Sequence, residues 1–323
     1  MILEVIYNKN MVLSKKLVVV LGSTSSGKSD LAVALARRFN GEIVSADSRQ
    51  VYRGMDLGTG KVPRDKKPKY PLYNSIELYS GYFYRGVRHH LLDVASPKRM
   101  FTAEEYKRKA RKVIQGIWKR GKLPILCGGT GFYIDAAVYG TEFPKVPPSP
   151  KLRGKMEKKT TDALFSELQR IDPARAAGID PKNRHRVMRS LEIAHALGRV
   201  PKIKTDPLPA DILFIGIKKE SEELKKLIRG RLKKRLKRGM LKEIANLHEN
   251  GVSWKRLESF GLEYRWGASF IQQKITEQEF IAGLERDIFR YAKRQMTWFR
   301  RNKNIYWLKI EKEAFALAKK FLK

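Results

Sequence analysis

The chain has 323 residues, of which 42% are hydrophobic and 10% aromatic, and this composition excludes an intrinsically disordered protein. No apolar run is long enough to span a membrane and the start carries no signal-peptide pattern, so we expect a cytoplasmic protein. The net charge is +35, which favours a polyanion such as nucleic acid as partner. An anionic membrane surface, or lysine-rich solubility alone, is the alternative interpretation of this charge.

The first predicted element is a buried strand over residues 17–21, and a loop and a helix follow it. The loop matches the Walker A pattern and consists of Gly22, Ser23, Thr24, Ser25, Ser26, Gly27, Lys28 and Ser29. Strand, glycine loop and helix in this order form a phosphate cradle, in which backbone N–H groups and Lys28 face the anion. Ser29 is placed to bind Mg²⁺. The pattern predicts a polyphosphate ligand without specifying which one, and an ordinary tight turn is the alternative.

A second strand, over residues 42–46, leads directly into Asp47. Ligands of open parallel sheets bind beyond the carboxyl ends of the strands, so we expect Asp47 beside the phosphate loop. An acid at that point is a general base, a Mg²⁺ ligand or a helix N-cap. Residues 62–88 then interleave basic and aromatic side chains, a pattern typical of an RNA-binding segment or of a hairpin with a solvated basic face. We interpret His89 and His90 as structural, because no further ligand stands at metal-binding spacing.

A helix is predicted over residues 102–119, with Thr102 as its N-cap and Glu105 three residues later. The next buried strand, over residues 123–127, includes the single cysteine, Cys127, which reads as a core residue and excludes an internal disulfide. This strand ends in a Gly-Gly-Thr-Gly sequence at residues 128–131. The glycines permit close backbone approach there, and the hydroxyl of Thr130 can donate to a phosphate oxygen or a substrate.

Clusters of proline at residues 144–150 and 207–209 delimit a helical insertion. We therefore expect an α/β core formed by residues 11–142 and 207–323 and an insertion domain at residues 143–206. Residues 1–10 are interpreted as a dispensable extension, because Met11 can be the true start. In the insertion, Arg184, His185, Arg186 and Arg189 share one helical turn, which predicts a solvated face or a nucleic-acid clamp.

The remaining chain returns to a strand at residues 211–217 and then forms two long basic helices. The first covers residues 221–247, bends at Gly239 and carries a stripe of Arg231, Arg235 and Arg238. The second covers residues 278–301 and carries Arg286, Arg290, Lys293 and Arg294 beside an apolar face. A strand at residues 305–308 and a closing helix complete the chain. The alternation indicates an α/β fold: a P-loop NTPase-like core with a parallel sheet, and a helical insertion domain.

Several motifs in sequence order resemble the tRNA dimethylallyltransferase family. They are the phosphate loop, Asp47-Ser48-Arg49-Gln50-Val51-Tyr52, Gly128-Gly129-Thr130-Gly131-Phe132-Tyr133 and Lys293-Arg294-Gln295-Met296-Thr297-Trp298-Phe299-Arg300. The resemblance implies transfer of a dimethylallyl group from dimethylallyl diphosphate to the exocyclic amine of an adenosine in tRNA, with Mg²⁺ as cofactor. That adenosine lies immediately 3′ of the anticodon in tRNAs that read codons starting with U. We also expect a monomer without a membrane partner, because nothing in the sequence demands more than a monomer.

The resemblance also implies roles for individual residues. The phosphate loop would hold the diphosphate of the prenyl donor, Asp47 would act as general base, and Thr130 would lie near the bridging oxygen. Lys28 and Arg231 would stabilise the departing diphosphate, while Leu227 stands where many members carry a second arginine, which weakens a two-arginine clamp. The implied tRNA contacts are Asp47, Ser48, Arg49, Gln50, Thr130, Arg153, His185, Arg186, Arg189, Lys293, Arg294, Gln295, Thr297 and Arg300.

Two other enzyme classes share parts of this pattern. A P-loop small-molecule or nucleoside kinase would bind ATP at the same loop and use Asp47 to activate a hydroxyl group. An adenylate isopentenyltransferase would use free AMP or ADP as the prenyl acceptor. The net charge of +35 fits the kinase poorly, and a test of a mononucleotide against tRNA as acceptor separates the adenylate enzyme from the tRNA-modifying one.

Overall fold

The computed structural model describes residues 15–66, 81–308 and 311–323. The chain forms two compact units, one of Met1–Val138 with Leu208–Lys323 and the other of Tyr139–Pro207. The extension predicted at residues 1–10 lies outside the described residues. In the described part of the chain, no helix has both the length and the apolar composition needed to cross a bilayer.

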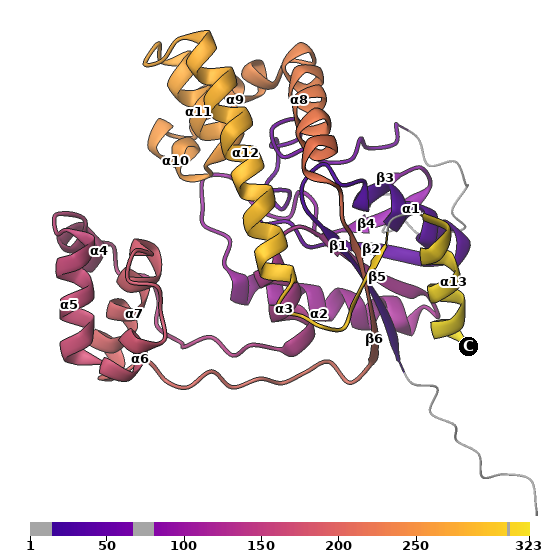
Figure 1. Ribbon diagram of the computed structural model, residues 1–323, viewed down its shortest axis with the longest axis horizontal. Coiled ribbons are helices and arrows are strands. Elements are labelled where there is room, and N and C mark those ends of the chain that lie inside the picture. Colours follow the sequence, from indigo (N-terminus) through magenta and orange to yellow (C-terminus); the bar gives the residue numbers. More distant parts are fainter. Residues whose placement is uncertain (1–14, 67–80, 309–310) are drawn as a thin grey trace, which may run out of the picture. The chain divides into compact units, whose positions relative to one another are not determined.

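The first unit is built on a seven-stranded sheet with the order β3-β4-β2-β5-β1-β6-β7. Every neighbouring pair is parallel except β3 and β4, which form an antiparallel hairpin at one edge. This sheet confirms the predicted α/β class with a parallel core (Figure 1). Its strands are β1 (Lys16–Gly22), β2 (Gly41–Ser45), β3 (Tyr82–Tyr84), β4 (Val87–His90), β5 (Leu123–Gly128), β6 (Asp211–Ile217) and β7 (Ile305–Leu308).

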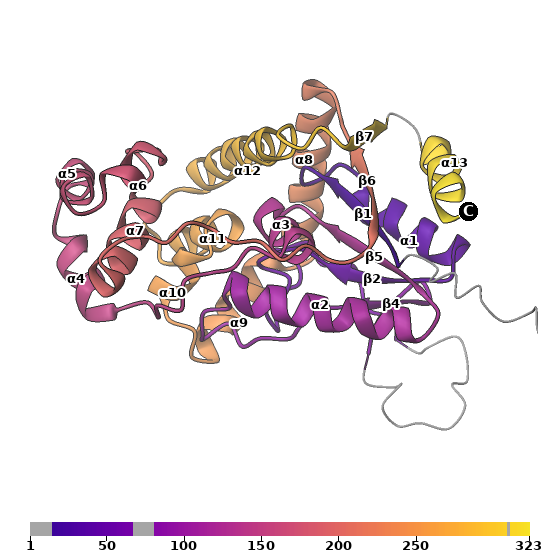
Figure 2. The ribbon, with the colours of Figure 1, turned by 90° about the horizontal axis from the view of Figure 1, so that it is seen from below.

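Both faces of the sheet are covered by helices, which explains why its central strands read as continuous apolar runs. Leu17, Val19 and Leu21 of β1 pack in one cluster with α2 (Ala103–Lys119) and α3 (Gly131–Tyr139). Val18 and Val20 pack in the opposite cluster with α1 (Lys28–Arg38) and α13 (Glu311–Leu322). Figure 2 shows α2 running along one side of the strands. Alternate residues of one strand therefore hold two separate helical layers in place.

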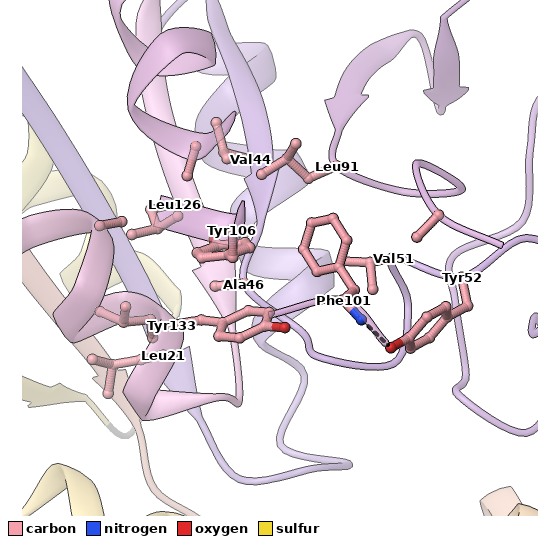
Figure 3. Close-up of a cluster of buried hydrophobic side chains, with 14 of the residues drawn as sticks. Leu21, Val44, Ala46, Val51, Tyr52, Leu91, Phe101, Tyr106, Leu126 and Tyr133 are labelled. Carbon is pink, nitrogen blue, oxygen red and sulfur yellow. Dashed lines mark hydrogen bonds between the residues drawn. The ribbon is translucent and has the colours of Figure 1, made fainter. Parts of the chain in front are cut away.

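The layer beneath α2 and α3 contains a group of aromatic side chains near the ends of the strands (Figure 3). The rings of Tyr106 and Tyr133 stack with their centroids 4.0 Å apart. Tyr106 also donates its hydroxyl hydrogen to the carbonyl oxygen of Ser45, at 3.0 Å. The backbone N–H of Phe101 donates to the hydroxyl oxygen of Tyr52, at 3.0 Å. These bonds anchor the loops that follow β2 and β4 to the core, because buried hydroxyl groups need partners.

Five helices of the first unit gather beyond the carboxyl ends of the strands: α8 (Ser221–Lys237), α9 (Met240–Glu249), α10 (Trp254–Ser259), α11 (Leu262–Ile271) and α12 (Glu277–Phe299). The prediction of one helix bent at Gly239 is wrong, because the chain ends α8 there and starts α9. Gly239 has φ 95°, a left-handed conformation that glycine adopts at little cost. A capping box of Thr276 and Glu279 starts α12. The predicted helix at residues 102–119 is confirmed as α2, with Thr102 as N-cap.

The second unit consists of four helices, α4 (Pro150–Glu157), α5 (Thr161–Ile171), α6 (Pro173–Ala177) and α7 (Arg184–Leu197). They enclose a small core of their own, in which Leu164, Leu168 and Leu191 are fully buried. The chain segments that enter and leave this unit are hydrogen-bonded to each other. Glu142 donates its N–H to the carbonyl of Lys204, and Asp206 donates to that of Gly140.

The described part of the basic and aromatic segment forms the β3–β4 hairpin, and residues 67–80 lie outside the described residues. His89 is buried and contacts the carbonyl of Val87, and burial lowers its pKa to about 4. No group of three or more potential metal ligands occurs in the described ranges.

Glu42, on β2, is a buried carboxylate that contacts three basic side chains. His90 Nε2 lies 2.7 Å from Oε2, Arg120 Nη2 lies 2.6 Å from Oε2, and Lys122 Nζ lies 3.0 Å from Oε1. Burial alone would raise the pKa of Glu42, but the hydrogen bonds from His90, Arg120 and Lys122 outweigh it and lower the pKa.

Because its folded-state pKa is depressed, Glu42 stabilises the fold above its unfolded pKa of about 4.3, and this stabilisation is lost as the pH falls toward the folded value. We expect Glu42→Gln to lower the free energy of unfolding at pH 7 by about 2 kcal/mol, because the buried carboxylate loses its charge-assisted hydrogen bonds to Arg120 and Lys122. Urea unfolding at pH 7 and between about pH 5 and pH 3 measures both effects. Glu104→Gln, at an exposed site of α2, is the control. Equal stability of the Glu42→Gln and Glu104→Gln variants at pH 7 would refute the assignment.

Candidate active site

A cleft opens in the first unit at the carboxyl ends of β1, β2 and β5. The phosphate loop, the segment after β2, a loop at residues 58–60 and helices α8 and α12 all contribute to its lining. Eight predicted site residues line it: Thr24, Lys28, Ser29, Asp47, Arg49, Gln50, Arg231 and Gln295. The sequence analysis assigned no role in the site to other lining residues, chiefly Gly58, Thr59, Gly60, Arg235, Glu263 and Tyr291.

The phosphate loop has the backbone of an anion cradle. Ser25 and Gly27 have φ 62° and 92°, so the chain turns tightly before α1 begins at Lys28. Lys28 Nζ donates to the carbonyl of Ser23 at 3.1 Å, which holds the side chain back over the loop. The Ser26 hydroxyl is the one buried side-chain polar atom without a hydrogen-bond partner in the described chain. A helix N-terminus and a lysine at one turn favour a phosphate group at this position.

Three cationic side chains meet in the cleft. Burial lowers the pKa of Lys28, and the charges of Arg231 and Arg235 add to that effect. Burial, followed by the charge of Arg235, lowers the pKa of Arg231 to about 10. Asp47 and Glu263 are the acidic residues that line the same cleft. This excess of positive charge is relieved when a polyanion binds, so the electrostatics favour a polyanionic ligand.

A second arginine, Arg235, lines the cleft beside Arg231. Leu227 is exposed and lies outside the cleft, but Arg235, one turn after Arg231, lines it. Arg235, which the sequence placed in a basic stripe with Arg231 and Arg238, is buried. Its Nη1 donates to Glu263 Oε1 at 2.8 Å and to the carbonyl of Gly58 at 3.3 Å. The buried Glu263 explains how this arginine is accommodated, and it carried no recognisable sequence signal.

The loop at residues 56–61 holds Arg231 in place. Arg231 Nη2 donates to the carbonyl of Gly60 at 3.0 Å. The loop is itself fixed by Glu243 of α9, whose carboxylate accepts the N–H groups of Asp56, Leu57 and Gly58 at 2.9, 2.6 and 3.0 Å. A carboxylate that accepts several backbone N–H groups makes strong, charge-assisted hydrogen bonds. Glu243 therefore supports Arg231 through the backbone of this loop.

Lys61 fixes the other end of the same loop. Its side chain is fully buried, and Nζ contacts Asp56 Oδ1 at 2.6 Å, Asp93 Oδ1 at 2.5 Å and the carbonyl of Tyr52 at 3.1 Å. A buried lysine with three oxygen partners has all its hydrogen-bond donors satisfied. The sequence could not identify Glu243 or Lys61 as supports of this loop, because their contacts are formed by the fold.

Asp47 stands directly after β2 and lines the cleft, as predicted. One carboxylate oxygen, Oδ1, accepts the N–H groups of Arg49 and Gln50 at 2.9 and 3.2 Å. No helix begins at these residues, so Oδ1 caps a turn and not a helix. No hydrogen bond to Oδ2 occurs among the described residues. Asp47 can therefore be held rigidly through one oxygen while the other accepts a proton.

Thr130 follows β5 and reaches toward the segment after β2. Its hydroxyl oxygen accepts the N–H of Ser48 at 3.1 Å and lies 3.4 Å from the Ser48 hydroxyl. Tyr291 of α12 lines the same cleft, and burial raises its pKa. Thr130 therefore lies close to Asp47 in space, and Tyr291 is a site residue that the sequence analysis missed. The pattern of apolar and basic residues along α12 did not indicate that Tyr291 faces the cleft.

Three of the predicted tRNA contacts beside Asp47 have partners within the protein. The backbone N–H of Ser48 is bound to Thr130, Arg49 Nε donates to the carbonyl of Phe260, and Gln50 Nε2 donates to the carbonyl of Thr59 at 3.3 Å. These contacts order the segment that carries Asp47. Contact of these residues with tRNA stays a prediction.

The predicted tRNA contacts on α12 divide into two groups. Lys293, Arg294, Thr297 and Arg300 are exposed, as a surface for a nucleic-acid backbone requires. Gln295 is buried, with only 6% of its surface exposed, and both ends of its amide are bonded to backbone groups of the protein.

In the insertion unit, His185 and Arg186 are exposed, whereas Arg153 and Arg189 form ion pairs with a buried acid. Arg153 binds both oxygens of Glu192 at 2.7 and 3.0 Å, and Arg189 Nη1 binds Oε2 at 3.0 Å. The Glu192 side chain is 1% exposed, while each arginine side chain is 33% exposed. Structural pairing therefore accounts for Arg153 and Arg189, and their tRNA contact stays a prediction.

The residues present fit a Mg²⁺ ion that is held mainly by a ligand. Ser29 and Asp47 supply a hydroxyl and a carboxylate in the cleft. This donor set is too small for a site built from protein groups alone. Mg²⁺ in phosphate-transfer sites keeps several waters and takes other ligands from the substrate phosphates.

Comparison with known proteins identifies relatives along almost the whole chain. The family described as IPP transferase matches residues 50–302, and the family described as isopentenyl transferase matches residues 15–69. The chain is 39% identical over 314 residues to tRNA dimethylallyltransferase 2 of Trichlorobacter lovleyi, a match that covers 96% of this chain and 97% of that protein. It is 35% identical to tRNA dimethylallyltransferase of Anoxybacillus flavithermus, over 91% of this chain and 90% of the relative.

Solved structures give the same result. The crystal structure of the tRNA isopentenylpyrophosphate transferase of Bacillus halodurans is similar with a TM-score of 0.66 and 31% identity, over 96% of this chain and 97% of that one. A eukaryotic dimethylallyltransferase acting on tRNA is similar with a TM-score of 0.75 and 26% identity, over 96% of this chain and 80% of that one.

We expect Glu243→Gln to weaken binding of inorganic pyrophosphate about ten-fold, because the loop that holds Arg231 loses a charged acceptor for three N–H groups. Titration calorimetry with Mg²⁺ and pyrophosphate measures the affinity. Glu249→Gln, exposed on the same helix, is the matched control. If Glu243→Gln binds pyrophosphate as tightly as that control, Arg231 is positioned without this loop.

Proposed function

The chain belongs to the tRNA dimethylallyltransferase family, and we propose that it transfers a dimethylallyl group from dimethylallyl diphosphate to tRNA. The acceptor is the exocyclic amine of the adenosine immediately 3′ of the anticodon in tRNAs that read codons starting with U, and the product is isopentenyladenosine. One observation carries the proposal: a cationic phosphate cradle and an acid with one unbonded oxygen line a single cleft. Relatives that share the full length of the chain are named for this reaction.

The leaving group presents the first chemical problem. The lone pair of an adenine amine is delocalised into the ring, so this weak nucleophile needs a carbon whose bond to oxygen breaks easily. The N–H groups of the phosphate loop, Lys28 and Arg231 would stabilise the negative charge that develops on the diphosphate as this bond breaks. These groups are fixed before the substrate binds, so they require little reorganisation during the reaction. A bound Mg²⁺, held by Ser29 and phosphate oxygens, would add positive charge to the diphosphate.

The new nitrogen–carbon bond leaves an extra proton on the amine. In our proposal Asp47 accepts this proton through Oδ2, while Oδ1 stays bonded to the N–H groups of Arg49 and Gln50. One N–C bond forms, one C–O bond breaks, diphosphate departs, and the proton is transferred to the carboxylate. Thr130, bonded to the N–H of Ser48, would orient the reacting groups beside Asp47.

The net charge of +35 would serve binding of the tRNA backbone. Exposed basic side chains occur on α12, at Lys293, Arg294 and Arg300, and in the insertion unit, at Arg186. The target base would be unstacked to reach the cleft, which costs less in an anticodon loop than in a duplex. The phosphate loop and Asp47 come from one chain, so we propose that a monomer is sufficient. We also propose that the protein acts in the cytoplasm.

The decisive experiment measures transfer from radiolabelled dimethylallyl diphosphate, with Mg²⁺, to an unmodified anticodon stem-loop, with AMP and ATP in parallel reactions. Label on the stem-loop and none on AMP is the expected result. Label on AMP would assign the chain to the mononucleotide branch. Phosphate transfer from ATP, without prenyl transfer, would make it a kinase.

We expect Asp47→Asn to reduce turnover about 10²- to 10⁴-fold, because asparagine can still cap residues 49 and 50 but cannot accept the proton. Filter binding is expected to show tRNA affinity within about two-fold of the wild type. Asp211→Asn, at the amino end of β6, is the control. The assignment of Asp47 as the base fails if Asp47→Asn retains turnover within a few-fold of the wild type.

We also expect Arg186→Ala and Arg294→Ala each to weaken tRNA binding and to lower the slope of log affinity against log salt by about 0.7 to 0.9 per lost phosphate contact. Binding measured across a salt series gives this slope. Arg37→Ala, exposed in the last turn of α1 at the opposite edge of the sheet, is the control. Slopes unchanged in both test variants would place the tRNA on another surface.

A further inference from the structure

Gln295 connects two loops that are far apart in the sequence. Its Oε1 accepts the N–H of Thr24 in the phosphate loop at 2.8 Å. Its Nε2 donates to the carbonyl of Gly129, in the loop after β5, at 2.8 Å. Among the described residues no other side chain is bonded to both loops. The two bonds use the acceptor and one donor of a single amide group that is almost completely buried.

The two loops belong to opposite sides of the chemistry proposed above. Thr24 lies in the cradle for the donor diphosphate, and Gly129 immediately precedes Thr130, which contacts the segment that carries Asp47. A shift of one loop relative to the other would change the distance between the leaving group and the base. Misplacement of reacting groups by about 1 Å can reduce a rate about 10²-fold. The relative position of these two loops therefore affects the rate of the proposed reaction.

The packing around Gly129 shows how closely the amide fits. A Cβ atom at residue 129 would lie 2.3 Å from Gln295 Nε2, while the next residue it would approach, Gly22, is 3.6 Å away at its carbonyl oxygen. The position therefore excludes a side chain because of Gln295 and not because of the backbone around it. The glycine at residue 129 leaves the space that the amide of Gln295 occupies.

We propose that Gln295 is a positioning residue that joins the phosphate loop to the threonine loop, so that donor and acceptor groups are held as one frame. This inference rests on the proposed function for its catalytic meaning. It replaces the expectation that Gln295 contacts tRNA, because both ends of the amide are already bonded inside the protein. Neighbouring residues of α12, Lys293 and Arg294, remain exposed.

The test is a double-mutant cycle of Gly129→Ala and Gln295→Ala, with pyrophosphate affinity measured by calorimetry in the presence of Mg²⁺ and no tRNA. Each single variant is expected to weaken binding about ten-fold. Gln295→Ala removes the group that a Cβ at residue 129 would meet, so the double variant is expected to match Gln295→Ala alone. Gln278→Ala, exposed in the first turns of the same helix, is the matched control.

Kinetics separate positioning from tRNA contact. We expect Gln295→Ala to lower kcat and raise the KM for dimethylallyl diphosphate, with tRNA affinity within about two-fold of the wild type. Two results would overturn the inference: additive effects in the cycle, or weaker tRNA binding with pyrophosphate affinity unchanged.

Two further provisions keep the test decisive. If Gln295→Ala does not fold, Gln295→Glu tests the same point, because it keeps the acceptor for Thr24 but places an oxygen against the carbonyl of Gly129. Wild-type pyrophosphate affinity in that variant would also overturn the inference. If the wild-type protein transfers no prenyl group, the proposed function fails, while the pyrophosphate cycle still decides the role of Gln295.

Discussion

Lys28, Arg231 and Arg235 lie together in one partly buried cleft at the carboxyl edge of the sheet. The surrounding structure has to offset the repulsion among these three charges. Burial and mutual repulsion depress the pKa values of Lys28 and Arg231, so these charges would move apart if nothing held them. Glu263 pairs with Arg235, and the loop at residues 56–61 supplies carbonyl groups to both arginines. Glu243 and Lys61 in turn fix that loop. Folding therefore already holds these like charges close together, and the cleft needs little reorganisation when an anionic substrate binds.

Much of this could be predicted from the sequence, because it depends on local patterns. The Walker A loop, the strands before Asp47 and Thr130, and the apolar faces of α2 and α12 are each encoded within a few neighbouring residues. The edge rule for parallel sheets then brings Asp47 and the phosphate loop together without further information. The Gly239 break was misjudged because a glycine in a helical pattern bends or ends a helix according to its φ, which the pattern does not contain.

The remaining site residues could not be predicted, because their roles arise from contacts between distant segments. Glu243 and Lys61 belong to ordinary helix and loop patterns until the fold brings them to residues 56–58 and Asp93. Arg235 reads as another member of a basic stripe, although burial beside Glu263 gives it a different role. Arg153 and Arg189 show the reverse case, since a tRNA-contact motif contains residues that the structure pairs with a buried Glu192. Whether each arginine is buried and paired with an acid distinguishes these cases, and a sequence motif does not contain that information.

The paired segments at residues 140–142 and 204–206 have a consequence for how this architecture can vary. The chain leaves and re-enters the sheet-bearing unit through two irregular segments that are hydrogen-bonded to each other, so the inserted helices form the closed end of one long loop. Lengthening, exchanging or deleting that closed end changes neither the order of the sheet strands nor the ends that the core must join. Loop-closure entropy grows only slowly with length, so such changes carry a small thermodynamic penalty. The insertion can thus be altered as a module while the chemistry at the sheet edge stays fixed.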